Sequence, residues 1–183
     1  ASTCVKVSGS MPQASCSSVK PAGLVYSELG SGTVSDPYQI FSGAQLISIA
    51  SDTTALSKHF IQCDHIDLSG MAQFKIGDDV NSFTGSFNGA GYKIKNYSYV
   101  DTAATMVGLF GKASKAEFKN IYLQNSIIDA DSVIGGLVGV LVDGGSVSNV
   151  LAINIKLKSS GVLSGGLSVV GGVVGIAEQG SYS

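Results

Sequence analysis

The stretch Met106 to Gly111 reads MVGLFG, and similar Gly-bounded apolar hexapeptides return as IGGLVG at Ile134 to Gly139 and VGGVVG at Val170 to Gly175. The three stretches start 28 and then 36 residues apart. A short pattern that recurs at intervals of this length indicates a repeat architecture.

A second motif alternates with these hexapeptides. It places an apolar residue before and after an asparagine, and the three asparagines are Asn96, Asn120 and Asn149. One unit therefore carries both motifs: a Gly-bounded apolar strand, a turn, and a strand that bends at Asn.

Units of this kind predict an all-β fold, a parallel β-helix (β-solenoid) of about five coils. One unit cannot bury its apolar side, whereas stacked coils align equivalent residues at roughly 4.8 Å and pair each backbone group above and below. We expect Asn96, Asn120 and Asn149 to stack as a structural ladder at one bend. A β-sandwich is the alternative, but it does not require asparagines in register.

The chain divides into three parts. Residues 1–35 are rich in Ser and Gly and are interpreted as a leader or linker, with a short strand expected at Cys4 to Val7. Residues 36–58 are expected to form a strand followed by an N-terminal α-helical cap. Ser42 and Gln45 have the spacing of a capping box, and the end of a solenoid needs a cover over its core. Residues 59–183 are expected to form the coils. The last four residues begin another unit, which predicts truncation at the C-terminus and packing against remaining C-terminal repeats of the same chain.

Strict alternation within the hexapeptides would place residues 106, 108 and 110 on one side and Leu109 on the other. If the first set lines the core, then Leu109, Leu137 and Val173 form an outward apolar ladder. Such a row either packs against a neighbouring molecule or segment, or is an interaction surface.

Composition excludes some classes of partner. Only 13% of the residues are charged, all eleven basic residues are Lys, and the net charge is -2, so the basic surface of a nucleic-acid-binding protein is missing. No apolar run reaches the roughly 18 residues of a membrane span. Of three cysteines, Cys4 and Cys16 are expected to form a disulfide, which leaves Cys63 as a buried thiol.

The motifs resemble the Glug-motif family, named for its Gly-Leu-any-Gly signature and found in large secreted and surface-anchored bacterial proteins. The similarity covers roughly residues 33–183 and departs from the family pattern at His65 and Val173. The matching stretches, in family order, are Asp36 to Ile40, Gln45-Leu46, His65 to Gly70, Phe83 to Ile94 and Val107 to Gly111. The resemblance implies an adhesin-like or stalk-like protein with no shared active site.

Two clusters contain side chains that can bind metals. His59, Cys63, His65 and Asp67 share one face of a predicted strand and are suitable donor types, but a polar strand surface is the simpler interpretation. Pairs of acidic residues at Asp129 and Asp131, or at Asp78 and Asp79, could hold calcium at a loop, although such residues are usually solvated. We therefore expect no metal and no cofactor.

Two functions fit these observations. The first is a non-catalytic extracellular module at a bacterial cell surface, acting in adhesion or as a stalk, with a glycan or protein of a host or neighbouring cell as its partner. The second is part of a carbohydrate-active enzyme, a polysaccharide lyase or glycosidase. The carboxylates available to it are Asp64, Asp67, Asp78 and Asp79, yet the chain lacks Arg and any aromatic cluster suited to sugars, which favours the first function. A structural spacer is a third possibility.

Overall fold

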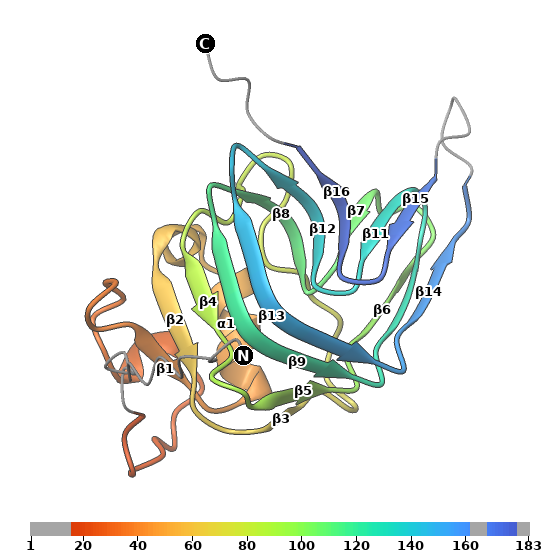
Figure 1. The fold of residues 1–183 in the computed structure, drawn as a ribbon. Coiled ribbons are helices and arrows are strands. Elements are labelled where there is room, and N and C mark those ends of the chain that lie inside the picture. The colour runs from red at the N-terminus through yellow and green to blue at the C-terminus, as the bar shows by residue number, and fades with distance from the viewer. Residues whose placement is uncertain (1–15, 162–167, 179–183) are drawn as a thin grey trace, which may run out of the picture.

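The chain forms a β-solenoid in a computed structural model that describes residues 16–161 and 168–178 (Figure 1). Every strand pair among these residues is parallel. The prediction of an all-β parallel solenoid is confirmed.

One wall of the solenoid has more layers than the others. Its stacking order is β1 (Tyr38–Ile40), β2 (His59–Gln62), β4 (Ser86–Asn88), β9 (Glu117–Gln124) and β13 (Ser146–Ile153). Beyond a bend, β3 (Ile66–Asp67) and β5 (Lys93–Lys95) continue it, and β5 pairs with the second half of β9.

The remaining walls are sheets of three strands. The first contains β6 (Ser98–Asp101), β10 (Ile127–Ala130) and β14 (Lys156–Ser159). The second contains β7 (Met106–Val107), β11 (Val133–Gly135) and β15 (Val169–Gly171). The third contains β8 (Phe110–Ser114), β12 (Val138–Val142) and β16 (Val174–Ala177).

The solenoid therefore has about three turns, and the prediction of about five coils is wrong. Within the described part of the chain, the residues before β6 add layers to the first wall, but elsewhere they form only two single bridges, both to β8: Ile76 to Phe110 and Phe83 to Ala113. Helices and loops take the place of the missing strands.

A short helix packs at the N-terminal end. It is α1 (Gly43–Ala50), and the Ser42 side chain accepts a hydrogen bond from the Gln45 amide as the capping spacing predicts. Leu46 and Ile49 are buried in the main core. The helix ends earlier than predicted because Asp52 caps a separate 3-10 helix, η2 (Thr53–Ser57). A third helical turn, η1 (Tyr26–Glu28), precedes β1.

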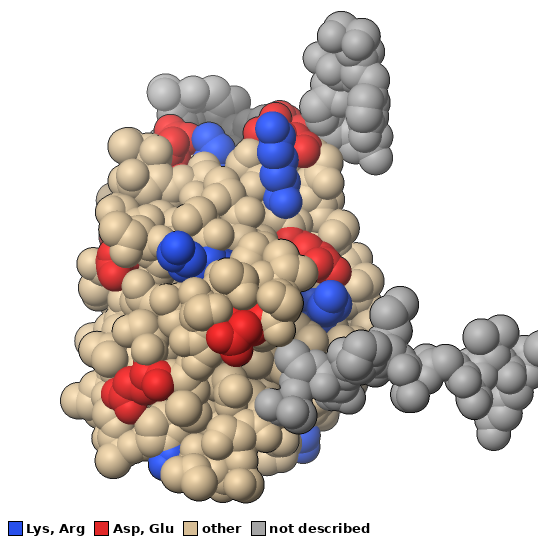
Figure 2. All heavy atoms as spheres, turned by 90° about the vertical axis from the view of Figure 1, so that its left-hand side faces the viewer, with Lys and Arg blue, Asp and Glu red and all other residues tan. Residues whose placement is uncertain are grey.

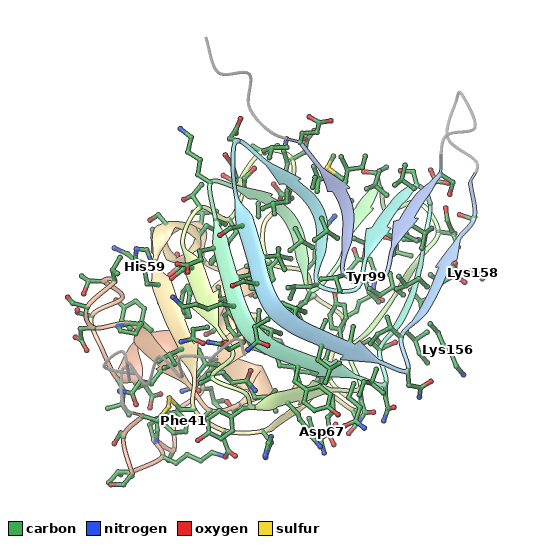
Figure 3. All side chains as sticks on the ribbon, in the orientation of Figure 1. Phe41, His59, Asp67, Tyr99, Lys156 and Lys158 are labelled. Atoms are coloured by element: carbon green, nitrogen blue, oxygen red, sulfur yellow. A yellow bond between two sulfur atoms is a disulfide. The ribbon has the colours of Figure 1, made fainter. Side chains whose placement is uncertain are left out.

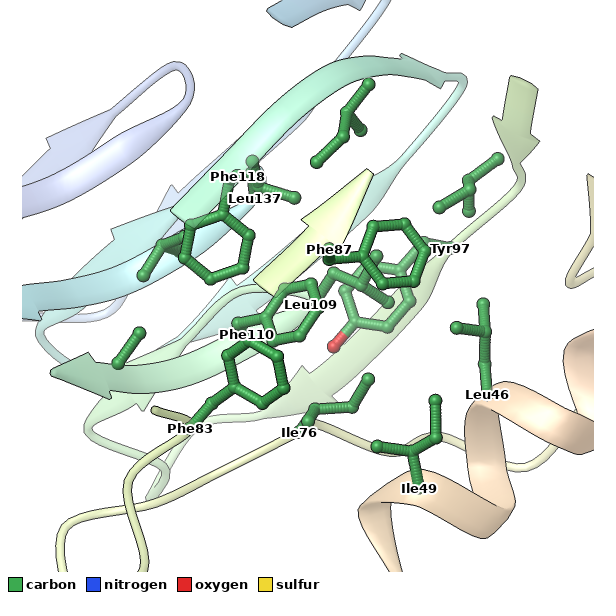
Figure 4. Close-up of a cluster of buried hydrophobic side chains, with 14 of the residues drawn as sticks. Leu46, Ile49, Ile76, Phe83, Phe87, Tyr97, Leu109, Phe110, Phe118 and Leu137 are labelled. Carbon is green, nitrogen blue, oxygen red and sulfur yellow. The ribbon is translucent and has the colours of Figure 1, made fainter. Parts of the chain in front are cut away.

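The core runs along the inside of the turns and contains stacked aromatic rings (Figure 4). The rings of Phe83, Phe110 and Phe118 form a triangle, with centroids 4.9 Å apart for Phe83 and Phe110, 4.7 Å for Phe110 and Phe118, and 5.7 Å for Phe83 and Phe118. The buried Tyr97 hydroxyl contacts the carbonyl oxygens of Phe74 and Gly108 at 2.6 and 2.9 Å. The one polar atom of this large side chain is therefore satisfied.

The predicted outward ladder is wrong, because its residues point inward. Leu109 and Leu137 are fully buried, and Val173 packs against the same core. The chain bends between β7 and β8 and does not continue as one strand, so side chains no longer alternate. Val107, Leu109 and Phe110 are all fully buried as a result.

Glycines allow the turns to approach closely beside this bend. A Cβ on Gly139 would lie 2.6 Å from the Gly111 carbonyl oxygen. A Cβ on Gly175 would lie 2.6 Å from the Gly139 carbonyl oxygen. The last glycine of each hexapeptide therefore leaves room for the backbone of the preceding turn.

The disulfide joins Cys16 to Cys63 with their Cα atoms 5.5 Å apart, which corrects the predicted Cys4–Cys16 pair and the free thiol at Cys63. Residues after Cys16 lie against the outer side of the first wall: the Ser17 amide donates to Gln39 at 2.7 Å. Cys16 and Leu29 pack on a small second core that includes Ile61 and Cys63. Cys4 and its predicted strand lie outside the described residues. Of the helices in the described part of the chain, none has the length and apolar character of a membrane span.

Candidate binding surface

Two columns of asparagines mark the bends on either side of β5. In the first, Asn149 Nδ2 donates to Asn120 Oδ1 at 2.7 Å, and Asn120 Nδ2 donates to Asn88 Oδ1 at 3.1 Å. Asn120 and Asn149 have φ of 55° and 50°, a left-handed conformation that Asn tolerates better than most residues. Each side chain thus shapes the bend and bonds to the next turn.

Asn96 is not in this column, which corrects one position of the predicted ladder. It lies at the second bend, where its φ is 60°, beside Asn125 at 57° and Asn154 at 54°. Asn154 Nδ2 donates to Asn125 Oδ1 at 2.8 Å, and Asn96 Nδ2 donates to the Asp67 carboxylate at 2.8 Å.

A strip of sheet lies between the two columns, and we call it the asparagine-bounded wall. It consists of β3, β5 and the second halves of β9 and β13. Strand register places two rows of side chains across it. The first row is Lys93, Tyr122 and Leu151, with His65 beside it just before β3, and the second row is Asp67, Lys95, Gln124 and Ile153.

Aromatic, cationic and apolar side chains meet on this wall. The Lys93 Nζ lies 5.0 Å from the centre of the Tyr122 ring, within the range of a cation–π contact. The His65 ring meets the Tyr92 ring edge to face at 5.4 Å, and its Nδ1 accepts a hydrogen bond from the Lys93 amide at 3.0 Å. Leu151 is 51% exposed. A ligand on this wall would find aromatic faces and apolar area beside amides.

Charge on the wall is low and paired. Asp67 lies 3.7 Å from Lys95, and its pKa is about 2, below the ordinary 3.8, mainly because the Asn96 amide donates to its carboxylate and secondly because the Ser69 amide does. Figure 3 shows Asp67 on the lower side of the solenoid, away from Lys156 and Lys158. On the face shown in Figure 2, acidic and basic side chains are spread over the surface, and some lie next to a side chain of the opposite charge.

The four residues proposed as metal ligands have other partners. Cys63 is in the disulfide, His59 Nδ1 contacts the Ser86 hydroxyl at 2.8 Å, and Asp67 is bonded as above. No group of three potential ligands occurs among residues 16–161 and 168–178. The predicted strand is also interrupted, since β2 ends at Gln62 and β3 begins at Ile66.

The acidic pairs suggested for calcium are engaged as well. Asp129 pairs with Lys158 at 2.8 Å, and Asp131 is buried. Asp78 accepts two backbone amides of its own turn, while Asp79 pairs with Lys112 at 2.7 Å.

Sequence reasoning missed Asn88, Asn125 and Asn154. It aligned Asn96 with Asn120, which is 24 residues away, whereas Asn96 and Asn125 are 29 residues apart, as are the bonded pairs Asn120–Asn149 and Asn125–Asn154. The 29-residue spacing of Asn96–Asn125, Asn120–Asn149 and Asn125–Asn154 was the signal that separates the two columns, although Asn88 and Asn120 are 32 residues apart.

Two curated proteins are similar to this chain. Halomucin of Haloquadratum walsbyi is 35% identical over 165 residues, which is 83% of this chain and 2% of that protein. A putative Gly-rich membrane protein of Evansella cellulosilytica is 31% identical over 120 residues, 60% of this chain and 14% of that protein. The chain thus spans a small part of each relative. No protein-family model matches it, and no solved structure does.

Proposed function

We propose that this chain is a non-catalytic β-solenoid module of a secreted or cell-surface protein, and that the asparagine-bounded wall is its ligand-binding face. The ligand is a glycan or a protein on a host or neighbouring cell. The observation that carries this proposal is the Tyr122–Lys93 pair beside exposed Leu151, on a wall framed by amide columns.

The chemistry of this wall suits recognition. Tyrosine offers an apolar ring and a polar hydroxyl, and such amphipathic side chains are enriched where proteins meet partners. The asparagine amides repeat with each turn, so the wall presents hydrogen-bonding groups at roughly 4.8 Å intervals along the solenoid. A repetitive ligand would meet the same groups at each turn.

The carboxylates do not favour catalysis. A glycosidase needs a general acid with a raised pKa and a second carboxylate facing it. The pKa of Asp64 is instead lowered, first by its hydrogen bond from Lys20, and the pKa of Asp67 is about 2. Neither of these two carboxyl groups therefore has the raised pKa that a general acid needs.

The similar proteins support a surface location. One is named halomucin and the other is described as a Gly-rich membrane protein, and the resemblance to Glug-motif proteins points the same way. We therefore place this chain outside the cell or on its surface.

A binding screen tests the proposal. The chain is applied to immobilised glycans and cell-surface proteins, and hits are measured again with Tyr122→Ala and Lys93→Ala. We expect these variants to bind at least about tenfold more weakly. Val100→Ala is the matched control, because Val100 is 53% exposed on β6, outside the wall. Hits that respond equally to the control, or no hits at all, would count against the wall.

A reducing-sugar release assay addresses the enzymatic alternative. We expect no turnover of the polysaccharides tested. Turnover that Asp67→Asn abolishes would replace the binding module with a carbohydrate-active enzyme.

A further inference from the structure

Asn88 is the only asparagine of this chain that is followed by glycine. The backbone nitrogen after an asparagine can attack the side-chain carbon Cγ and close a cyclic imide, and a side chain on the following residue hinders that approach. Gly89 has no side chain. The pair lies where β4 ends and the chain enters the first asparagine column. Gly89 therefore supplies the least hindered nucleophile of this kind in the protein.

Two donors hold the side-chain carbonyl of Asn88. Its Oδ1 accepts the Ala90 amide at 3.0 Å and Asn120 Nδ2 at 3.1 Å. The Ala90 amide fixes which side-chain atom is the oxygen, since a backbone N–H can only donate. When a nitrogen attacks Cγ, negative charge develops on Oδ1, and donors that are already in place stabilise it as in an oxyanion hole. The bend thus polarises the carbonyl that is attacked.

The leaving group is not engaged. Asn88 Nδ2 donates no hydrogen bond to any residue that the structure describes. By contrast, the Nδ2 atoms of Asn96, Asn120, Asn149 and Asn154 each donate to a neighbouring turn. Asn88 is also only half-buried, which gives water access to it. Loss of ammonia from Asn88 would therefore break no contact of the column.

One hydrogen bond restrains the nucleophile. The Gly89 amide donates to the Lys119 carbonyl oxygen at 2.9 Å, and this bond must open before the nitrogen can lose its proton and turn toward Cγ. Asn88 is the last residue of β4, and backbone bonds at the ends of elements open at a lower free energy than those at their centres. The reaction therefore requires local opening at this bend, and the solenoid stays folded.

We propose that Asn88 is a self-modification site, which converts to aspartate without an enzyme. The Gly89 nitrogen gives its proton to hydroxide or water and bonds to Cγ, the Cγ–Nδ2 bond breaks, and the side-chain amide leaves as ammonia. Water then opens the imide at Cγ, which restores the Gly89 amide and leaves a carboxyl group on residue 88. No electron is transferred, so no oxidant or reductant is needed.

The first asparagine column can hold this product. A carboxylate at position 88 accepts the Ala90 and Asn120 donors as the amide oxygen does, and hydrogen bonds to an ionised acceptor are the stronger ones. The second column already has this arrangement, because Asn96 Nδ2 donates to the Asp67 carboxylate at 2.8 Å. The modification thus adds a negative charge at the edge of the asparagine-bounded wall and keeps the column.

The other hydrolysis product does not fit this bend. Opening of the imide at the backbone carbonyl gives isoaspartate, which lengthens the main chain just before Gly89. The chain is closely packed at this point, since even a Cβ on Gly89 would clash with the Asn120 carbonyl oxygen. We therefore expect the folded molecules to carry aspartate.

Peptide mapping of the folded chain after incubation at mildly alkaline pH tests the proposal. We expect the amide of Asn88 to become a carboxyl group at least about tenfold faster than that of Asn125. Asn125 is the internal control, because it also accepts from the next turn but is followed by Ser126. Asn81 is exposed in a turn before Ser82 and controls for access of water. An Asn88 that stays unchanged, or that converts no faster than Asn81 or Asn125, overturns the proposal.

Two variants test whether the column holds the product. Asn88→Asp should unfold at the wild-type temperature or above it. Asn120→Asp is the matched control, because it makes the same change of charge one turn away but removes the donor to Asn88 Oδ1, and it should unfold at a lower temperature. If Asn88→Asp lowers the unfolding temperature as much as Asn120→Asp does, the column does not accept the modified residue and the assignment is wrong.

Discussion

Asn149 and Asn120 lie one above the other at the first bend, with Asn149 Nδ2 donating to Asn120 Oδ1 at 2.7 Å. Both backbones are left-handed, so the same residue type bends the chain and binds the next turn. Asn120 is the middle member, since its own amide donates to Asn88 at 3.1 Å. A substitution there removes contacts in both directions.

We expect Asn120→Ala to lower the free energy of unfolding by about 2–3 kcal/mol. Two partly exposed hydrogen bonds contribute roughly 0.5–1.5 kcal/mol each, and Ala at positive φ adds about 1 kcal/mol of strain. Asn120→Gly separates the effects because glycine adopts this φ freely. Urea denaturation should find the glycine variant about 1 kcal/mol more stable than the alanine variant, and equal stabilities would contradict a strain contribution.

Ser126→Ala should stabilise the protein by about 1 kcal/mol. Ser126 is fully buried and, in the described structure, its Oγ has no hydrogen-bond partner, a burial cost that alanine avoids. Ser86→Ala is the matched control, because the Ser86 hydroxyl contacts His59, and it should leave stability unchanged or lower it. A decrease on Ser126→Ala in thermal unfolding would show that this hydroxyl is satisfied.

Sequence patterns predicted the type of fold because the repeat is periodic and the apolar residues are spaced for stacking. They also located the helix, since Ser42 and Gln45 form a local signal that does not depend on the rest of the chain. Non-local features were harder. Cys16 meets Cys63 only because the segment after Cys16 folds back on the outer side of the first wall, and nothing in the spacing of the cysteines encodes that path.

The predicted outward direction of the Leu109 side chain was wrong for a different reason. Alternation holds only within a strand, and Gly108 permits a bend that turns consecutive side chains inward. The asparagine-bounded wall was also not foreseen, because it depends on the register between β5 and β9. The expected register aligned Asn96 with Asn120, whereas the observed register aligns it with Asn125. This difference of five residues turns one asparagine column into two.

Removing the disulfide should destabilise the outer segment. Cys16 and Cys63 are 47 residues apart in sequence, and closing loops of this size typically stabilises by about 2–4 kcal/mol. Cys16→Ser with Cys63→Ser should lower the unfolding midpoint and speed hydrogen exchange around Leu29 more than in β9. Peptide mapping without reduction should recover the Cys16 and Cys63 peptides linked, and a Cys4–Cys16 link would contradict the structure.

Stability should depend on Asp67 in acid. Its folded pKa of about 2 lies below the ordinary 3.8, so the unfolded chain binds the proton first as pH falls. The contribution of Asp67 is therefore fully present above about pH 4 and is lost as the pH drops through about 2. Asp67→Asn should flatten the decline in the unfolding midpoint between those values. An NMR titration of the Asp67 carboxyl that gives an ordinary pKa would remove the basis for this expectation.

We expect glycine to be required at position 139 and dispensable at position 172, although Gly139 and Gly172 both lie within the Gly-bounded hexapeptides. A Cβ at Gly139 would meet the Gly111 carbonyl oxygen at 2.6 Å and the Val107 nitrogen at 2.8 Å. These are backbone atoms that cannot move without opening the stack. We expect Gly139→Ala to cost about 2–3 kcal/mol, the range of an overpacked core. A Cβ at Gly172 meets no atom within 4 Å, and its φ is not in the left-handed range, so Gly172→Ala should be neutral or slightly stabilising. Chemical denaturation of the two variants compares a Gly→Ala substitution whose Cβ meets the backbone of a neighbouring turn with one whose Cβ meets no atom. Equal losses would mean that the glycines serve backbone flexibility and not the close approach of successive turns.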